Sequence, residues 1–306
     1  MNSHRHAYLI IAHGNFELLN TLISLLDDER NDIFLHIDKK AGPVPQLRQC
    51  LKSQFVLTPV RHDVRWGDVS LVKCELELYR TAYEHGEYRY FHLISGVDLP
   101  IKSQDFIHDF FDRNDGKEFI SFFPDDDYTR GDIERKMSYY YFLMRWNARC
   151  SFVPKPLVVF SQIVRHSALV VQRMLHVRRE ASLDFKKGDE WASLTQNAVK
   201  LILDSERFIL RRFSHTTCSD EIYKHSLIYS SPLRANIYCM DDRQKGNMRF
   251  IDFERAPREQ QLRGEPYVWQ DSDLDELTSS PFLFARKINP EASRLIAGIV
   301  DFVSKQ

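Results

Sequence analysis

The stretch YRYFHLISGVDLPIKS, residues 88–103, decides the fold of this chain. It begins as an apolar run typical of a buried strand and then breaks into Ser-Gly-Val-Asp before Pro100. The break predicts that the strand ends at residue 95 and that a loop presents Asp98 at the edge of a sheet. Two interpretations stay open: Asp98 belongs to a binding site, or Pro100 only fixes a structural turn.

Strand and helix patterns alternate around this stretch. We expect strands at residues 7–12, 32–38, 55–60 and 118–123, and helices at 16–28, 70–85 and 104–114. Alternation at this pitch predicts βαβ units, and therefore an α/β fold with a mainly parallel, Rossmann-like sheet flanked by helices. Ligands of such sheets bind at the carboxyl ends of the strands, where Asp38 and Ser95 fall.

The middle of the chain has a different composition. Lys and Arg outnumber Asp and Glu by 12 to 4 in residues 128–187, where basic residues punctuate apolar runs. This pattern predicts a helical, basic insertion over residues 126–187. One interpretation is a helical cover on the sheet with a solvated basic face. The other is a peripheral membrane surface that meets anionic lipid.

The remaining segments complete one catalytic unit that spans residues 1–306. The patterns predict mostly helical segments at 191–214 and 219–231, short strands at 249–253 and 282–288, and a closing helix at 290–305. We expect a nucleotide-binding half at residues 6–125 and an acceptor and catalytic half at 188–306, with the insertion between them.

Composition and missing motifs exclude several classes of protein. A net charge of −1 provides no field for nucleic acid, so no nucleic-acid partner is expected. Five scattered cysteines without a CxxC pair suggest neither a zinc site nor a disulfide framework, and favour a reducing compartment. We see no signal peptide and no run of about 18 apolar residues, and expect a cytoplasmic protein.

The common catalytic signatures are also missing. The chain has no GxGxxG, P-loop, GxSxG or HExxH motif, which argues against common dehydrogenases, kinases, hydrolases and zinc proteases. Three consecutive acids, Asp125, Asp126 and Asp127, could bind a metal, but such a run more often marks an exposed loop. The acidic pair Asp220-Glu221 could complement a helix dipole or supply a general base.

Seven segments taken together carry a resemblance to a known family. In chain order they are AYLIIAH, HIDKK, VRWGDVSLVKCELELYRTA, YFHLISGVDLPIKS, DEWASLT, SDEIYKHSLIYSS and LFARKI. Their order and spacing, from about residue 6 to about residue 290, resemble the core-2/I-branching glycosyltransferases. The resemblance implies a GT-A-type fold and an inverting transfer from a UDP-sugar, without a metal bound by a DxD motif. Without a membrane anchor, the chain looks like a bacterial member.

The resemblance also implies roles for individual residues. The family's general base is the glutamate of a D-E pair, which falls on Glu221 after Asp220. Its diphosphate-stabilising lysine falls on Lys287, and the matching arginine falls near Arg263, with Arg286 as a competitor. A departing UDP develops negative charge on its β-phosphate, so cationic side chains are needed there when no metal is bound.

The other positions surround the donor. Asp38 matches the family position that contacts uridine or ribose, and His13 lies near the same edge. The loop after residue 94 should line the donor site, with Gly96 allowing a close backbone approach and Asp98 facing the sugar. The complete set of expected donor and acceptor residues is His13, Asp38, Trp66, Ser95, Gly96, Asp98, Trp191 and Asp220.

The sequence therefore predicts an inverting, metal-independent transferase that needs no cofactor besides its co-substrate. N-acetylglucosamine is the favoured sugar, while xylose, glucose and galactose stay open. The expected partners are a UDP-sugar and a glycan or lipid-linked glycan acceptor, in bacterial surface polysaccharide synthesis. Peripheral contact with an anionic membrane, at the inner face of the cytoplasmic membrane, is a further expectation. The alternatives are a non-catalytic nucleotide-sugar or glycan-binding protein and a metal-dependent transferase that uses residues 125–127.

Overall fold

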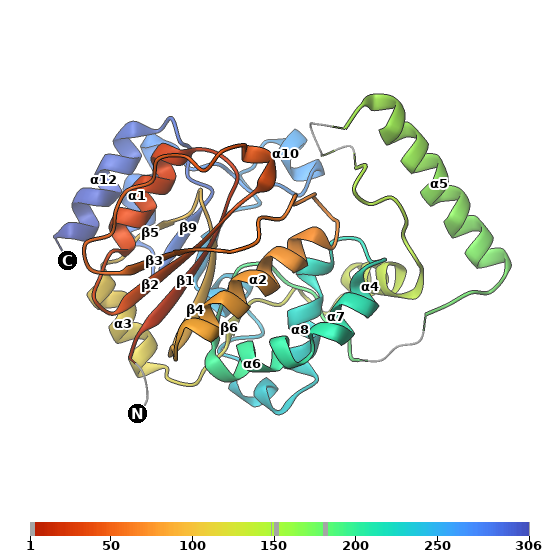
Figure 1. The fold of residues 1–306 in the computed structure, drawn as a ribbon, viewed down its shortest axis with the longest axis horizontal. Coiled ribbons are helices and arrows are strands. Elements are labelled where there is room, and N and C mark those ends of the chain that lie inside the picture. The colour runs from red at the N-terminus through yellow and green to blue at the C-terminus, as the bar shows by residue number, and fades with distance from the viewer. Residues whose placement is uncertain (1–3, 148, 150–152, 180–182, 306) are drawn as a thin grey trace.

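A computed structural model describes residues 4–147, 149, 153–179 and 183–305 of the chain. It shows a six-stranded sheet in the order β3-β2-β1-β4-β7-β6 (Figure 1). The strands are β1 (His6–Ala12), β2 (Asn31–Ile37), β3 (Gln54–Leu57), β4 (Tyr90–Ser95), β6 (Phe119–Ile120) and β7 (Ala192–Thr195). The first four run parallel, whereas β7 runs antiparallel to both β4 and β6. The predicted α/β class with a mostly parallel sheet is confirmed, and the architecture is that of a GT-A-like fold.

Helices cover both faces of this sheet. One face packs against α1 (Phe16–Leu26), α3 (Gln104–Arg113) and α12 (Ser293–Ser304). The other packs against α2 (Ser70–His85), α6 (Gln196–Asp204), α7 (Glu206–Phe213) and α8 (Tyr223–Tyr229). Alternate residues of β1 contribute to the two cores, with Tyr8 on one side and Leu9 on the other. Because both faces are covered, every residue of β1 is buried, as is usual for parallel sheets.

A second sheet of three strands lies beside the carboxyl edge of the first. It has the order β5-β9-β8, with β5 (Leu99–Pro100), β8 (Arg249–Ile251) and β9 (Phe284–Arg286). Since β5 follows the loop after β4 directly, its pairing with β9 brings the end of β9 to that loop. The fold also contains several short elements. They are η1 (Lys39–Ala41), η2 (Ser219–Glu221), η3 (Pro232–Asn236), α9 (Arg243–Asn247), α10 (Arg258–Leu262), η4 (Asp271–Asp273) and α11 (Leu274–Ser279).

The insertion contains two helices, α4 (Asp127–Ser138) and α5 (Lys155–Met174), as its pattern predicts. The expectation that it covers the sheet is wrong for α5, which lies apart from the sheet at one end of the molecule (Figure 1). Its contacts run instead to the segment that follows α4, where Ser161 donates a hydrogen bond to the carbonyl oxygen of Trp146 at 2.6 Å.

The segment at 191–214 is mostly helical as predicted, in α6 and α7, although it begins with the strand β7, because Leu194 and its neighbours pair with β4. One local prediction is wrong. The predicted helix at 219–231 is broken after the 3-10 turn η2, and α8 begins only at Tyr223. The division of the chain into a nucleotide half and an acceptor half stays a prediction.

Candidate active site

A cavity of about 510 Å³ opens at the carboxyl edge of the main sheet. The register of the strands creates it, since Ala12 at the end of β1 lies opposite Ile37, and Ile11 lies opposite Ser95. The adjacent strands β2, β1 and β4 therefore all end at the same edge of the sheet. The end of β9, from the second sheet, forms another part of the cavity wall. This is the position at which parallel α/β sheets bind ligands.

Most of the residues predicted from the sequence come together here. The ones that line the cavity are His13, Asp38, Trp66, Ser95, Gly96, Trp191, Arg286 and Lys287. Asp98 lies behind the wall, and Arg263, Asp220 and Glu221 lie outside the set of described residues that line this cavity. Lys40, Arg65, Arg149 and Glu190 also line it and were not among the predicted site residues.

The end of β9 supplies two adjacent cations to the cavity wall. The Arg286 guanidinium lies 4.2 Å from the ring centre of Trp191, and it donates a 2.8 Å hydrogen bond to Asp98 Oδ1. Burial, and then the charge of Arg286, lower the pKa of Lys287 from its usual value. Two cations in a partly desolvated wall have unfavourable mutual repulsion that a bound anion relieves. This end of the cavity therefore suits an anionic group such as a diphosphate.

Asp98 holds this wall in place. Only 2% of its side chain is exposed, and its carboxylate accepts hydrogen bonds from the Ser95 backbone N–H at 2.8 Å and the Ser95 hydroxyl at 2.5 Å. Its other contact is Arg286, so the predicted orientation of Asp98 toward a sugar is replaced by an orientation toward the guanidinium. Gly96 fits the same loop, since a Cβ there would lie 3.0 Å from Ala12 Cβ at the end of β1.

Asp38, at the end of β2, lines the same cavity. Its carboxylate accepts a 2.7 Å hydrogen bond from Lys40 Nζ, which also contacts Asp63 at 3.0 Å. The indole of Trp66 is 42% exposed and stacks against the Arg149 guanidinium at 3.7 Å. A carboxylate and an accessible aromatic face are the groups that a nucleoside or a sugar can use. The sequence signal for Lys40 was the pair of lysines that directly follows Asp38.

His13 lies at the same edge as Asp38. Burial is the largest influence on its imidazole and lowers the pKa of His13, although the nearby carboxylate of Asp38 opposes this effect. A neutral imidazole is therefore favoured near neutral pH, and it can donate from one ring nitrogen and accept at the other.

Glu221 lies in the turn η2, which contacts the loop that leads into the cavity wall. Its carboxylate is 3.2 Å from Lys187 Nζ and 3.6 Å from Lys136 Nζ. The Gly188 N–H donates a 3.0 Å hydrogen bond to the Glu221 carbonyl oxygen, two residues before Glu190 enters the cavity wall. A Cβ on Gly188 would lie 2.0 Å from the Ser121 carbonyl oxygen, so only glycine fits this junction. The loop that carries Glu190 is thus fixed against the turn that carries Glu221.

Buried acids lie between Glu221 and the cavity. Burial, then the charges of Glu221 and Glu75, raise the pKa of Asp220 to about 7. Burial and the carboxylates of Glu75 and Asp220 also raise the pKa of Glu190 well above its usual value. Glu190 Oε1 is buried without a hydrogen-bond partner among the described residues. Lys224 Nζ compensates part of this charge through a 2.7 Å contact with Glu75, and both of these side chains are fully buried.

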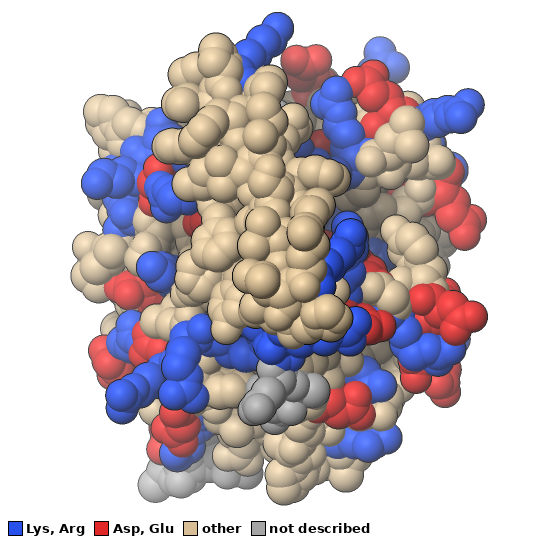
Figure 2. Space-filling view, turned by 90° about the vertical axis from the view of Figure 1, so that its right-hand side faces the viewer, with Lys and Arg blue, Asp and Glu red and all other residues tan. Residues whose placement is uncertain are grey.

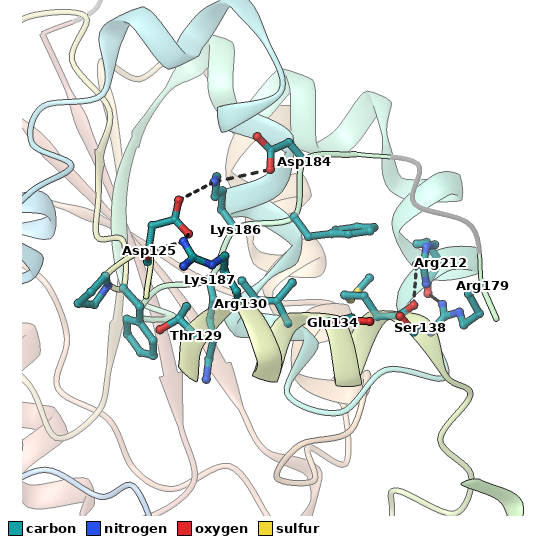
Figure 3. Close-up of a pocket in the computed structure, with 15 residues that line it drawn as sticks. Asp125, Thr129, Arg130, Glu134, Ser138, Arg179, Asp184, Lys186, Lys187 and Arg212 are labelled. Carbon is teal, nitrogen blue, oxygen red and sulfur yellow. Dashed lines mark hydrogen bonds and ion pairs between the residues drawn. The ribbon is translucent and has the colours of Figure 1, made fainter. Parts of the chain in front are cut away.

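A second cavity of about 350 Å³ lies between α4 and residues 184–187 (Figure 3). Lys186 lies between Asp184 and Asp125 there, at 3.6 Å and 3.8 Å, as Figure 3 shows. Lys187 lines this cavity and also contacts Glu221, so the Glu221 carboxylate lies next to a residue of the second cavity.

The acidic run at 125–127 is engaged in local contacts at the start of α4. Asp126 caps the helix by accepting a 2.7 Å hydrogen bond from the Thr129 N–H. Asp125 and Asp127 both contact Arg130, at 3.1 Å and 2.8 Å. Among the residues that the structure describes, no group of three or more His, Cys, Asp or Glu side chains is arranged to hold a metal ion.

The mostly parallel sheet, with a cation-lined cavity at its carboxyl edge, is consistent with a GT-A-like glycosyltransferase fold. The family model of the Core-2/I-Branching enzyme matches residues 6–263, and the chain belongs to this family. No curated protein is significantly similar to the chain. The family is one of glycosyltransferases, which implies a nucleotide-sugar donor and a glycan acceptor. The match ends before Arg286 and Lys287, so the argument for these two residues depends on the cavity itself.

Proposed function

We propose that this glycosyltransferase inverts the anomeric carbon as it transfers a sugar from a UDP-sugar to an acceptor hydroxyl, without a bound metal. The observation that carries the proposal is that Arg286, Lys287 and Asp38 line the same cavity at the carboxyl edge of the sheet. A nucleoside diphosphate would bind there with its base and ribose near the carboxylate and its phosphates near the cations. The sugar would then extend toward Glu190 and Trp191.

The wall formed by Arg286 and Lys287 would stabilise the leaving group. Negative charge builds on the β-phosphate as its bond to the sugar breaks, and preorganised cations lower the energy of that state. Asp98 fixes the guanidinium before the donor arrives, which avoids reorganisation during the reaction. The ammonium of Lys287, whose pKa is lowered in the free protein, regains its preference for the charged form beside the phosphate.

Glu221 would serve as the general base. In a single displacement, the acceptor oxygen forms a bond to the anomeric carbon as the bond from that carbon to the UDP oxygen breaks. The carboxylate takes the proton of the acceptor hydroxyl, and the electron pair of the broken bond leaves with UDP. Lys136 and Lys187 orient the carboxylate from the side of the second cavity. Asp220 remains behind it as a buried neighbour with a raised pKa.

The family supports N-acetylglucosamine as the first sugar to test, with xylose, glucose and galactose as further candidates. The proposed acceptor is a glycan of a bacterial surface polysaccharide, free or lipid-linked, and the proposed location is the cytoplasm.

The experiment is a donor screen. Purified protein is incubated with a panel of UDP-sugars in EDTA, UDP release is measured, and Glu221→Gln is compared with the exposed control Glu291→Gln. We expect hydrolysis of one donor that survives EDTA and weakens in Glu221→Gln alone. Activity that is lost with EDTA and restored by Mn²⁺ would favour the metal-dependent alternative. A lack of binding of every UDP-sugar would overturn the donor class.

A further inference from the structure

Helix α5 exposes the side that a helix of a soluble protein normally buries. Its buried side chains are Ser161 and Gln172, both polar. Gln172 exchanges two hydrogen bonds with the backbone of Tyr140, at 2.8 Å and 2.9 Å. The apolar residues at the opposite positions of the helix are exposed: Val159, Phe160, Ile163, Val170, Val171 and Met174. An ordinary surface helix has the reverse arrangement, with the apolar side packed on the core.

The charge of the surrounding segment is one-sided. Residues 135–179 contain nine Lys and Arg residues but none of the 43 Asp and Glu residues of the chain. Lys155, Arg173 and Arg178, on α5 or just after it, are exposed, and Arg178 also lies 3.4 Å from the Glu134 carboxylate of α4. Figure 2 looks at the side of the molecule on which α5 lies and shows a broad uncharged surface with a band of Lys and Arg below it. The basic band and the apolar face are thus next to each other.

We propose that α5 docks flat on the surface of an anionic lipid bilayer. The basic side chains would meet the phosphate groups of the lipids, and the apolar side chains would enter the boundary between headgroups and acyl chains. A helix of 20 residues has a length of about 30 Å, so it offers a long contact parallel to the surface. The described helices include none that is long and apolar enough to cross a membrane.

The charge around α5 favours an anionic bilayer over a second copy of the chain as the partner of this helix. An apolar face alone would suit a dimer, but two copies would bring the exposed Lys155 and Arg173 of two α5 helices, which have no ion-pair partner among the described residues, against each other. Like charges at close range oppose such an association, whereas an anionic bilayer compensates them. The apolar side of α5 and the basic residues around it thus indicate the same partner, an anionic bilayer.

The docking face is connected to the donor cavity. The Phe160 ring of α5 lies 6.4 Å from the Trp146 ring, and the same segment continues to Arg149, which stacks on Trp66 in the cavity wall. If the proposed transferase function holds, the bilayer would bring a lipid-linked acceptor to this side of the molecule. The docking itself does not depend on that function.

Vesicle co-sedimentation tests the docking. The full chain is mixed with vesicles of phosphatidylcholine alone, or of phosphatidylcholine with phosphatidylglycerol, at low and high salt. We expect sedimentation with the anionic vesicles that weakens at high salt. Sedimentation that is absent, or equal with both kinds of vesicle, would overturn the proposal.

Two variants separate the contributions of charge and apolar contact. Lys155→Gln/Arg173→Gln/Arg178→Gln should weaken the partition by roughly a hundredfold, from about fivefold for each basic residue. Val159→Ser/Ile163→Ser/Met174→Ser should weaken it by more than about tenfold. These apolar residues are 53%, 59% and 72% exposed, so the variant removes no core packing. The control Leu51→Ser, at a side chain that is 87% exposed on another part of the surface, should bind as the unmodified chain does.

Two measurements without vesicles complete the test. Sedimentation velocity that shows a dimer, lost in the apolar variant while vesicle binding is absent, would assign this face to a second copy and overturn the proposal. UDP binding should be equal in all the variants. A failure of UDP binding in every form, with vesicle binding intact, would contradict the proposed transferase and leave the docking supported.

Discussion

The two arginines that compete for the diphosphate can be separated by one pair of variants. Arg286→Met removes a cation from the cavity wall, and Arg263→Met removes one from the end of α10. Both changes keep the approximate length of the side chain. We predict that Arg286→Met weakens UDP binding strongly and that Arg263→Met leaves it nearly unchanged.

The structure gives the size of each effect. The Arg286 side chain is 15% exposed, lines the cavity and has a guanidinium held by Asp98. A hydrogen bond to a charged group contributes about 1.5–3 kcal/mol, which corresponds to a loss of about 10- to 150-fold in affinity. The Arg263 side chain is 57% exposed and forms an ion pair with Glu259 outside the cavity. Such a surface pair contributes about 0.2–1 kcal/mol to stability, and its loss should change UDP affinity by less than about twofold.

Titration calorimetry with UDP and with uridine is the assay. Uridine has no phosphate, so its affinity should be equal in both variants if the nucleoside end of the cavity is intact. Arg286→Met also leaves the buried Asp98 carboxylate without its cation, which lowers stability. Arg286→Lys and a thermal unfolding curve control for this effect. The lysine variant keeps the charge, so it should retain part of the UDP affinity.

The result that refutes the reasoning is a reversal of the two variants. If Arg263→Met loses tenfold or more in UDP affinity while Arg286→Met keeps it, the loop around α10 supplies the arginine. The β9 wall would then be structural, and the proposed path of the diphosphate would be wrong.

Three further predictions follow from the site and its surroundings. Glu221→Gln should lower kcat by about 10²- to 10⁴-fold with UDP affinity unchanged, measured by UDP release and calorimetry, because it removes a proton acceptor and no donor contact. The pKa of Lys287 is lowered, so its ammonium is present at low pH and is lost as pH rises toward its usual value. UDP affinity should therefore fall as pH rises, and it should fall less in Lys287→Arg when titrated over the same range. Glu75→Gln should lower the free energy of unfolding by about 3–5 kcal/mol in urea, because it leaves the buried Lys224 charge unpaired. The double variant Glu75→Gln/Lys224→Met should recover most of that loss.

Elements whose pattern is local were predicted well from the sequence. The helix α2 has the predicted bounds, because its apolar periodicity agrees with the face that it buries. The strand β4 ends at the predicted residue 95, because its continuous apolar run is buried on both faces of the sheet. The strand β7 was missed because Ala192–Thr195 is short and only its pairing with β4 keeps it extended. A local sequence pattern does not predict pairing with a strand about 100 positions away.

The residues of the candidate site were likewise predictable only where their position follows from a local sequence pattern. Residues at strand ends, such as Asp38 and Ser95, were predictable because a parallel sheet brings its carboxyl ends together. Arg149 was not, since its position against Trp66 depends on how the insertion folds back over the cavity. The buried cluster of Glu75, Glu190 and Lys224 was also unpredictable, because it joins three segments whose contacts are purely tertiary.

The loop after β4 connects these observations to the proposed chemistry. In this loop Asp98 directs its carboxylate at Arg286, and the pairing of β5 with β9 fixes the distance between them. The Asp98 carboxylate therefore holds the Arg286 guanidinium, a cation of the protein itself. This contact positions the guanidinium in the cavity wall, next to Lys287 in the chain. Substitution of Asp98 by Asn would place an amide N–H₂ against either the Ser95 N–H or the Arg286 guanidinium, both of which are donors. This dependence of the cationic wall on one buried carboxylate supports the proposal of a transfer in which side chains, and not a metal, stabilise the leaving diphosphate.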